Sequence, residues 1–157
     1  MSKLLTKIFY IAGCFIILGL VVSWNIAGRL VASVPVEISK PQNNLPVDAI
    51  KLNSDSGSVI SGWHLRHENS KGVVLLFHGI RANRLSMLKR AEMLYSHGYS
   101  SVLIDFQAHG QSSGEKITIG YLEQFDVKAT IEFAKKHHAG EPVGVIGVSM
   151  GGAASLL

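Results

Sequence analysis

The alternation of apolar and polar positions divides this chain into one long apolar segment and a region where strand and helix patterns alternate. Residues 8–28 contain no charged side chain. At 1.5 Å per residue, a helix over this segment is about 30 Å long, which matches the thickness of a hydrocarbon core. We interpret residues 8–30 as a transmembrane anchor and residues 1–7 as a cytoplasmic N-terminus.

Two other interpretations of this segment stay open. Val31-Ala32-Ser33 offers small residues for signal-peptide cleavage, but the apolar run exceeds the usual ~7–15 residues of a signal peptide. Ile11-Ala12-Gly13-Cys14 resembles a lipobox, yet the apolar run continues beyond Cys14. Length therefore favours an uncleaved anchor.

The charges that flank the anchor give a weak indication of its orientation. Lys3 and Lys7 precede the apolar run, and Arg29 and Lys40 follow it. Since basic residues favour the cytoplasmic side, this bias slightly favours an N-terminus inside the cell. We expect a single-pass membrane protein with its domain on the extracytoplasmic side.

After the anchor, residues 31–48 hold three of the four prolines and read as a polar linker, and residues 49–157 show an α/β pattern. Strands are expected at residues 50–52, 59–65, 73–77, 101–104 and 142–148, and helices at 86–97 and 121–136. The first two strands flank the polar residues 53–57, which predicts a hairpin. Strands that alternate with helices imply parallel pairing and right-handed crossovers.

Composition and charge exclude several kinds of function. The formal charge is +4, but the basic residues are scattered, so we expect no nucleic-acid binding. The single cysteine, Cys14, excludes an intrachain disulfide. The pair His137-His138 follows an expected helix and reads as a solvated helix end, and no Cys/His cluster has metal-ligand spacing. We expect neither a metal nor a cofactor.

The strongest chemical signal is Gly147-Val148-Ser149-Met150-Gly151, which follows an apolar run and precedes small residues. In the context of a strand, a turn and a helix, G-x-S-x-G is typical of a nucleophile elbow with the serine at the tip. A Cβ at Gly147 or Gly151 would obstruct such a sharp turn. Ser149 is therefore the candidate nucleophile for acyl transfer.

A second motif, His78-Gly79, ends the strand at 73–77 and opens the loop that follows. In an α/β hydrolase this loop supplies one oxyanion-hole N–H, and the residue after the nucleophile supplies the other. The donors here would be the backbone amides of Ile80 and Met150. His78 precedes the nucleophile, the wrong chain order for a triad base, and we expect it to hydrogen-bond a nearby backbone carbonyl.

A third motif, Asp105-Phe106-Gln107-Ala108-His109-Gly110-Gln111-Ser112, follows the strand at 101–104. With HGxxxN at 78–83 and GVSMGG at 147–152, it resembles the α/β-hydrolase superfamily, in the serine aminopeptidase and monoglyceride-lipase-like branch. The resemblance covers residues 50–157. It implies the N-terminal portion of an α/β-hydrolase sheet, with about five strands and flanking helices.

The resemblance also implies roles for individual residues. It implies Ser149 as the nucleophile, and it implies that Asp105 and His109 shape their loop and are not the triad acid and base. Many relatives carry Arg where this chain has Gln107, so an ion pair made by that Arg is lost here. In the family the triad acid and base follow the nucleophile, so we expect this chain to be a fragment or a truncated product without them.

The sequence thus predicts a serine hydrolase of ester, thioester or small amide bonds that takes a small-molecule acyl substrate. The identity of the substrate and the oligomeric state are not readable. The alternative is a non-catalytic, membrane-tethered α/β module. A nucleotide-binding fold is disfavoured, because residues 78–81 do not supply G-x-G-x-x-G after the first buried strand.

Overall fold

The computed structural model describes residues 3–41 and 45–157, and the chain forms two compact units that divide after Ala32. Met1 and Ser2 of the expected cytoplasmic N-terminus lie outside the described residues. The same holds for Gln42, Asn43 and Asn44 of the expected linker.

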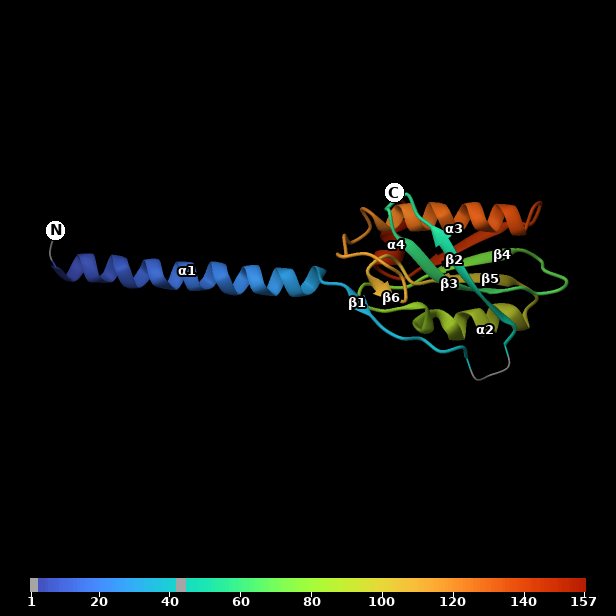
Figure 1. The fold of residues 1–157 in the computed structure, drawn as a ribbon, viewed down its shortest axis with the longest axis horizontal. Coiled ribbons are helices and arrows are strands. Elements are labelled where there is room, and N and C mark those ends of the chain that lie inside the picture. Colours follow the sequence, from blue (N-terminus) through green and yellow to red (C-terminus); the bar gives the residue numbers. More distant parts are fainter. Residues whose placement is uncertain (1–2, 42–44) are drawn as a thin grey trace. The chain divides into compact units, whose positions relative to one another are not determined.

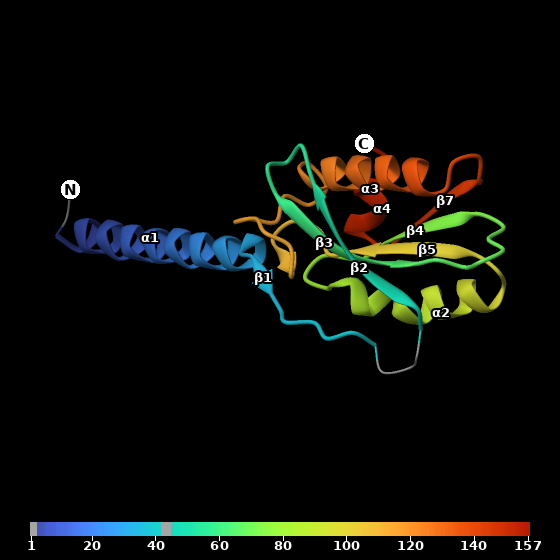
Figure 2. The same ribbon diagram turned by 45° about the vertical axis from the view of Figure 1, so that its right-hand side comes forward.

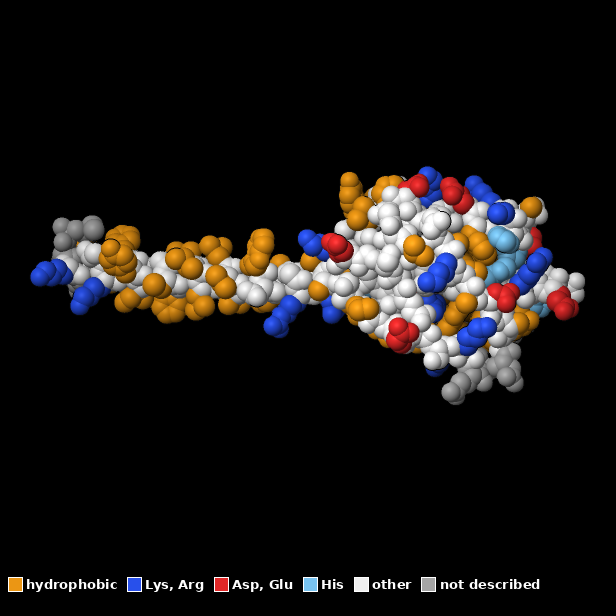
Figure 3. Space-filling view, viewed as in Figure 1, with side chains coloured by type: hydrophobic (Ala, Val, Ile, Leu, Met, Phe, Trp, Pro, Cys, Tyr) orange, Lys and Arg blue, Asp and Glu red, His pale blue; other side chains and the backbone are white. Residues whose placement is uncertain are grey.

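The first unit is one helix, α1 (Lys3–Val31), longer at both ends than the predicted anchor (Figure 1). An 18-residue window of its segment Leu5–Val31 has a mean hydropathy of 2.3, and none of that window is buried within the protein. Apolar side chains cover its visible face in Figure 3. A helix of this length and composition fits a membrane span, and a signal sequence has the same properties.

The second unit is built on a five-stranded sheet, as predicted. Its strands run in the order β2-β3-β5-β4-β7. Their bounds are β2 (Val47–Asn53), β3 (Val59–Leu65), β4 (Val73–Phe77), β5 (Ser100–Ile104) and β7 (Val143–Gly147). β2 and β3 form the predicted antiparallel hairpin, and β3 continues antiparallel to β5. The predicted parallel pairing holds for β4, which lies between β5 and β7.

The helices cover both faces of this sheet (Figures 1 and 2). They are α2 (Leu88–Ser96), α3 (Glu123–His137) and the short α4 (Met150–Ala154), and the 3-10 helix η1 (Arg84–Met87) precedes α2. The observed helical segment therefore begins earlier than the helix predicted at 86–97, and its first turn is the more tightly wound 3-10 helix. The side chain of Asn83 accepts a hydrogen bond from the N–H of Leu85, which caps the first turn.

Alternating side chains on the central strands divide the core into two clusters. Leu75 and Phe77 of β4 pack into a cluster with residues of α3 and α4, and Leu76 packs into a cluster with Met87 and Ala91 beside α2. This division follows from the two-residue period of a strand that is covered on both faces. β7 forms an edge of the sheet, where its valines Val143 and Val145 are 41% and 44% exposed.

A second, two-stranded sheet was not expected from the sequence. β1 (Val34–Pro35) pairs in parallel with β6 (His109–Gly110). Ile38, three residues further on, is only 7% exposed and belongs to the α2-side core cluster. These residues fall within the predicted linker at 31–48, so the structure differs from that expectation. The strand partners of Val34 and Pro35 lie more than 70 positions away, where a local composition signal carries no information.

Candidate active site

Ser149 lies at the junction of β7 and α4 and has an unusual backbone conformation. Its φ is 50° and its ψ is −113°, outside the backbone conformations that non-glycine residues normally adopt. The side chain is exposed and caps no N–H of α4. The turn is closed by a hydrogen bond of 2.9 Å from the N–H of Gly151 to the carbonyl of Val148. The strained turn leaves the hydroxyl at the surface.

The two glycines that frame Ser149 are required by space. A Cβ placed on Gly147 would lie 2.5 Å from the backbone carbon of Gly151. A Cβ placed on Gly151 would lie 2.6 Å from the carbonyl oxygen of Phe77, at the end of β4. Gly152 differs, because its Cβ would come no closer than 3.4 Å to Gly147. The steric argument made from the sequence is thus confirmed at both motif glycines.

The loop after β4 lies against this turn. A Cβ on Gly79 would stand 3.7 Å from the Cβ of Ser149 and 3.5 Å from the carbonyl oxygen of Val148. Among residues 3–41 and 45–157, neither the N–H of Ile80 nor that of Met150 makes a hydrogen bond. Two backbone donors without an acceptor among the described residues therefore directly follow Gly79 and Ser149 in the chain, one in the loop and one at the start of α4.

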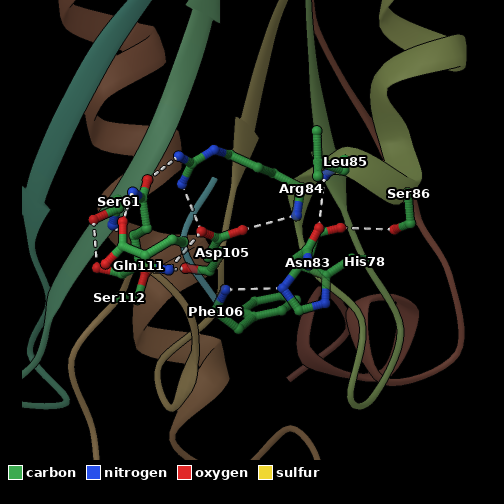
Figure 4. Close-up of polar contacts among 11 residues, drawn as sticks. Ser61, His78, Asn83, Arg84, Leu85, Ser86, Asp105, Phe106, Gln111 and Ser112 are labelled. Carbon is green, nitrogen blue, oxygen red and sulfur yellow. Dashed lines mark hydrogen bonds and ion pairs between the residues drawn. The ribbon is translucent and has the colours of Figure 1, made fainter. Parts of the chain in front are cut away.

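His78 is fully buried and connects the ends of two neighbouring strands. Its Nδ1–H donates to the carbonyl of Gly79 at 2.7 Å, the kind of contact expected from the sequence. Its Nε2 accepts the N–H of Phe106 at 3.0 Å (Figure 4). Because one ring nitrogen donates and the other accepts, the imidazole is held neutral in a single tautomer.

His109 bridges backbone segments in the same way, from the loop after β5. Its Nδ1–H donates to the carbonyl of Gln107 at 2.8 Å, and its Nε2 accepts the N–H of Arg81 at 3.0 Å. Burial lowers the pKa of His109, and burial lowers the pKa of His78 to about 4. Both ring nitrogens of each histidine are occupied by backbone groups, so neither ring is placed to take a proton from Ser149.

Asp105 is fully buried and forms an ion pair that the sequence did not reveal. Its carboxylate accepts from Arg84 Nη1 at 2.5 Å, from the N–H of Arg84 at 2.7 Å and from the N–H of Gln111 at 3.0 Å (Figure 4). The Arg84 guanidinium also contacts Gln111 Oε1 and stacks 4.6 Å from the centre of the Trp63 ring. Burial raises the pKa of Asp105 and lowers that of Arg84, and the pairing opposes both shifts.

Gln107 occupies the position where many relatives carry Arg. Its side-chain N–H groups donate to the carbonyl of Lys116 at 3.0 Å and to Glu123 Oε1 at 3.4 Å. Its backbone N–H donates to the buried Asp126 at 2.8 Å. Burial raises the pKa of Asp126 to about 6, and three hydrogen bonds oppose that rise. Hydrogen bonds thus stand where the resemblance implies an ion pair, and neither Glu123 nor Asp126 was singled out by the sequence.

The histidines at the end of α3 were expected to be solvated. His137 is exposed as expected, but His138 is only 2% exposed. The Nε2 of His138 lies 2.8 Å from the Nε2 of His64, and its Nδ1 lies 3.0 Å from Glu141. His138 is buried because His64 of β3 packs against the end of α3. In the described parts of the chain, no three His, Cys, Asp or Glu side chains are arranged to hold a metal ion.

Comparisons with known proteins agree with this geometry. The family described as serine aminopeptidase, S33, matches residues 68–157. The uncharacterized protein YqkD of Bacillus subtilis (strain 168) is 29% identical over 111 residues, which cover 69% of this chain and 36% of that protein.

Solved structures show the same fold. The esterase Pf2001 of Pyrococcus furiosus is 29% identical with a TM-score of 0.68, over 76% of this chain and 49% of the esterase. XC6422 of Xanthomonas campestris, an α/β serine hydrolase without a lid, is 19% identical with a TM-score of 0.61, over 74% of this chain and 57% of that protein. The chain thus spans about half the length of these relatives or less. With the family match over residues 68–157, the chain belongs to the S33 serine aminopeptidase family of the α/β-hydrolase superfamily.

Proposed function

We propose that this protein is a serine hydrolase that cleaves esters through an acyl-enzyme on Ser149. The observation that carries the proposal is the strained, exposed serine beside two backbone N–H groups that have no acceptor among the described residues. The family match and the similarity to an esterase support the same chemistry. Thioesters and small amides belong to the wider class that this mechanism serves.

The proposed reaction is acyl transfer in two steps. The Ser149 oxygen attacks the carbonyl carbon of the substrate, and the negative charge that develops on the carbonyl oxygen is stabilised by the amides of Ile80 and Met150. Such donors contribute about 3–4 kcal/mol each in known enzymes. The proton that the Ser149 hydroxyl loses leaves with the alcohol, and water then attacks the acyl-enzyme, which releases the acid and returns a proton to the Ser149 oxygen.

The general base is not assigned to a described histidine near the turn. His78 and His109 use both ring nitrogens for backbone contacts. In α/β hydrolases the acid and the base follow the nucleophile in chain order, and residues 150–157 contain no Asp, Glu or His. The proposal therefore covers Ser149 as the nucleophile and the amides of Ile80 and Met150 as the oxyanion hole.

The test is covalent labelling of the full-length protein with a fluorophosphonate, followed by mass spectrometry of the labelled peptide. We expect label on Ser149 and none in Ser149→Ala. Ser155→Ala is a matched control, because the Ser155 hydroxyl donates within α4 to the carbonyl of Gly151 at 2.6 Å and should not react. A folded wild-type protein that takes no label would overturn the proposal and favour a non-catalytic tethered module.

Substrate preference is tested with p-nitrophenyl esters of increasing acyl length beside aminoacyl anilides. We expect turnover of the esters, and Ser149→Ala should abolish it. Turnover of anilides alone would replace the ester assignment with aminopeptidase chemistry, which the name of the family also allows.

We also propose that α1 is an uncleaved anchor with the hydrolase domain on the extracytoplasmic side. The length of the apolar helix and the lysines Lys3 and Lys7 before it support this orientation. N-terminal sequencing of the protein from native membranes should find the helix intact, and external protease should digest the domain in intact cells. A mature N-terminus near Ala32 would show instead that α1 is a signal peptide.

A further inference from the structure

The segment that follows α1 is held by backbone hydrogen bonds to the loop beside the candidate site. We define residues 33–38 as the strap and residues 105–112 as the support loop. The N–H of Val34 donates to the carbonyl of Ala108 at 2.7 Å, and the N–H of Val36 donates to the carbonyl of Gly110 at 2.9 Å. Pro35 lies between them, at the one position whose missing N–H costs no bond in this pairing.

Side chains of the strap add contacts at both ends. Val34 packs against the core cluster beneath α3, and Ile38 is buried in the cluster beneath α2. Between them, the carboxylate of Glu37 accepts from Gln111 Nε2 at 3.1 Å. The strap is therefore fixed to both halves of the core and to the support loop, although its composition resembles a linker.

The support loop needs such restraint because Ala108 has a strained, left-handed backbone conformation. Ala108 has a φ of 59° and Gly110 a φ of 52°, and a Cβ on Gly110 would overlap the carboxylate of Asp105. The two strap bonds end on these two residues. A non-glycine residue in the left-handed region is unfavourable by about 1–3 kcal/mol unless its surroundings hold it there. The strap supplies some of that surrounding structure.

The support loop in turn holds the segment that carries the oxyanion donor. His109 lies in β6, the strand that pairs with the strap, and its Nε2 accepts the N–H of Arg81. Arg81 directly follows Ile80 and also has a positive φ of 57°. A second route runs from Glu37 through Gln111 to Arg84, which lies three residues after Arg81. Both routes end on the loop after β4.

We propose that the strap is a positioning element of the active site, which sets the place of the Ile80 amide through the support loop and His109. The proposal rests on the proposed hydrolase function. Only Ala32 and Ser33 separate α1 from β1. The residues that connect the apolar helix to the domain therefore also position the oxyanion hole, and Val34, Val36 and Glu37 act through other residues without touching substrate.

The test uses the full-length protein and two strap variants. Val36→Pro removes the N–H that donates to Gly110, and Glu37→Ala removes the acceptor for Gln111. We expect Val36→Pro to lower kcat for a p-nitrophenyl ester by about tenfold with KM unchanged, because a misplaced oxyanion donor weakens only transition-state binding. The rate of fluorophosphonate labelling at Ser149 should fall in parallel. In Glu37→Ala, kcat should fall by a smaller factor. Glu37→Gln keeps an acceptor oxygen and should have the wild-type kcat.

Glu115→Ala is the matched control, since this glutamate is exposed in the next loop. A Val36→Pro protein that folds and keeps the wild-type kcat would overturn the proposal. If Val36→Pro fails to fold, Glu37→Ala decides, because the exposed Glu37 does not belong to the core. An unchanged kcat in that variant overturns the proposal as well.

Hydrogen exchange distinguishes failure of the proposed hydrolase function from failure of the proposed role of the strap. If wild-type protein neither hydrolyses esters nor takes label, the proposed function fails. Amide exchange at residues 79–83 then tests the strap directly. Faster exchange there in Val36→Pro supports the coupling, and exchange equal to wild type overturns it.

Discussion

The turn around Ser149 and the support loop at 105–112 both contact the loop after β4, and they reach their conformations by opposite means. The segment 147–152 contains no ionisable side chain and depends on two glycines whose missing Cβ atoms let backbone segments approach closely. The support loop depends on a buried carboxylate, a neutral histidine and an arginine from a neighbouring element. Steric fit specifies the turn that carries Ser149, and polar pairing specifies the support loop.

The difference has an energetic consequence. Strain at Ser149 is a local cost of about 1–3 kcal/mol that neighbouring backbone must offset. The Asp105–Arg84 pair instead carries a desolvation cost, which its hydrogen bonds offset only while both partners are present. We therefore expect removal of the Ser149 hydroxyl to separate activity from stability, and substitutions at the support loop to affect both.

Ser149→Ala gives the largest expected effect and the clearest separation. Because the nucleophile is lost, ester hydrolysis should fall by about 1,000-fold or more. The melting temperature should stay close to wild type, since the exposed hydroxyl caps nothing in α4. Parallel kinetics and thermal unfolding check both expectations, and retention of hydrolysis would remove Ser149 from the mechanism.

Breaking the buried ion pair should lower stability strongly. Arg84→Met leaves the Asp105 carboxylate buried without its cation, and such single losses cost about 3–5 kcal/mol. Denaturant unfolding of Arg84→Met, of Asp105→Asn and of the double variant measures the coupling. We expect the double variant to be less destabilised than the sum of the single variants, and simple additivity would contradict the pairing.

Asp126 should make stability depend on pH, whereas the turn has no titrating group. The pKa of Asp126 is about 6 in the folded protein, above the ordinary 3.8. Its stabilising contribution is therefore complete below pH 3.8 and is lost as the pH rises through about 6. Relative to wild type, Asp126→Asn should gain up to about 3 kcal/mol between pH 4 and pH 7. Denaturant unfolding of both proteins at these two pH values tests this prediction. An equal difference in unfolding free energy at both pH values would contradict it.

The histidines act in the opposite direction. Burial lowers the pKa of both His64 and His78 to about 4, so their contribution is complete above pH 6.5 and is lost as the pH falls through about 4. The comparison of Asp126→Asn with wild type cancels this effect, because both proteins carry the same histidines.

Two glycines of one motif should differ in their tolerance of alanine. Gly147→Ala places a Cβ 2.5 Å from backbone atoms and should cost about 1–3 kcal/mol and most of the activity. Gly152→Ala, whose Cβ would come no closer than 3.4 Å to its neighbours, should fold and react nearly as wild type. Equal effects at both positions would show that the turn does not depend on the close approach.

Much of the fold and some of the site followed from local patterns. The five strands and the helices after them were predicted because apolar periodicity reports burial directly. The glycines around Ser149 were predicted because a sharp turn restricts residue type at fixed offsets from the serine. The catalytic roles of Ser149, Ile80 and Met150 remain predictions that the experiments above test.

The contacts that hold the site together were not predictable in this way. Arg84 reaches Asp105 across 21 positions, Glu37 reaches Gln111 across 74, and His64 reaches His138 across 74. Asp105 and Gln111 belong to a recognised motif, but Arg84 and Glu37 each have the sequence signature of an ordinary surface group. The strap was read as a linker for the same reason, since its prolines and polar neighbours describe its composition and not its partners.

The sequence by itself thus determined which segments form the five-stranded sheet, which turn carries the serine and where backbone must approach backbone. Those properties depend on neighbours within a few residues, whose steric limits and burial repeat with a fixed period. The tertiary structure alone decided that β1 pairs with β6, that two histidines bridge loops as neutral rings and that an arginine is buried on a carboxylate. Those contacts join groups that only the folded sheet brings within hydrogen-bond distance.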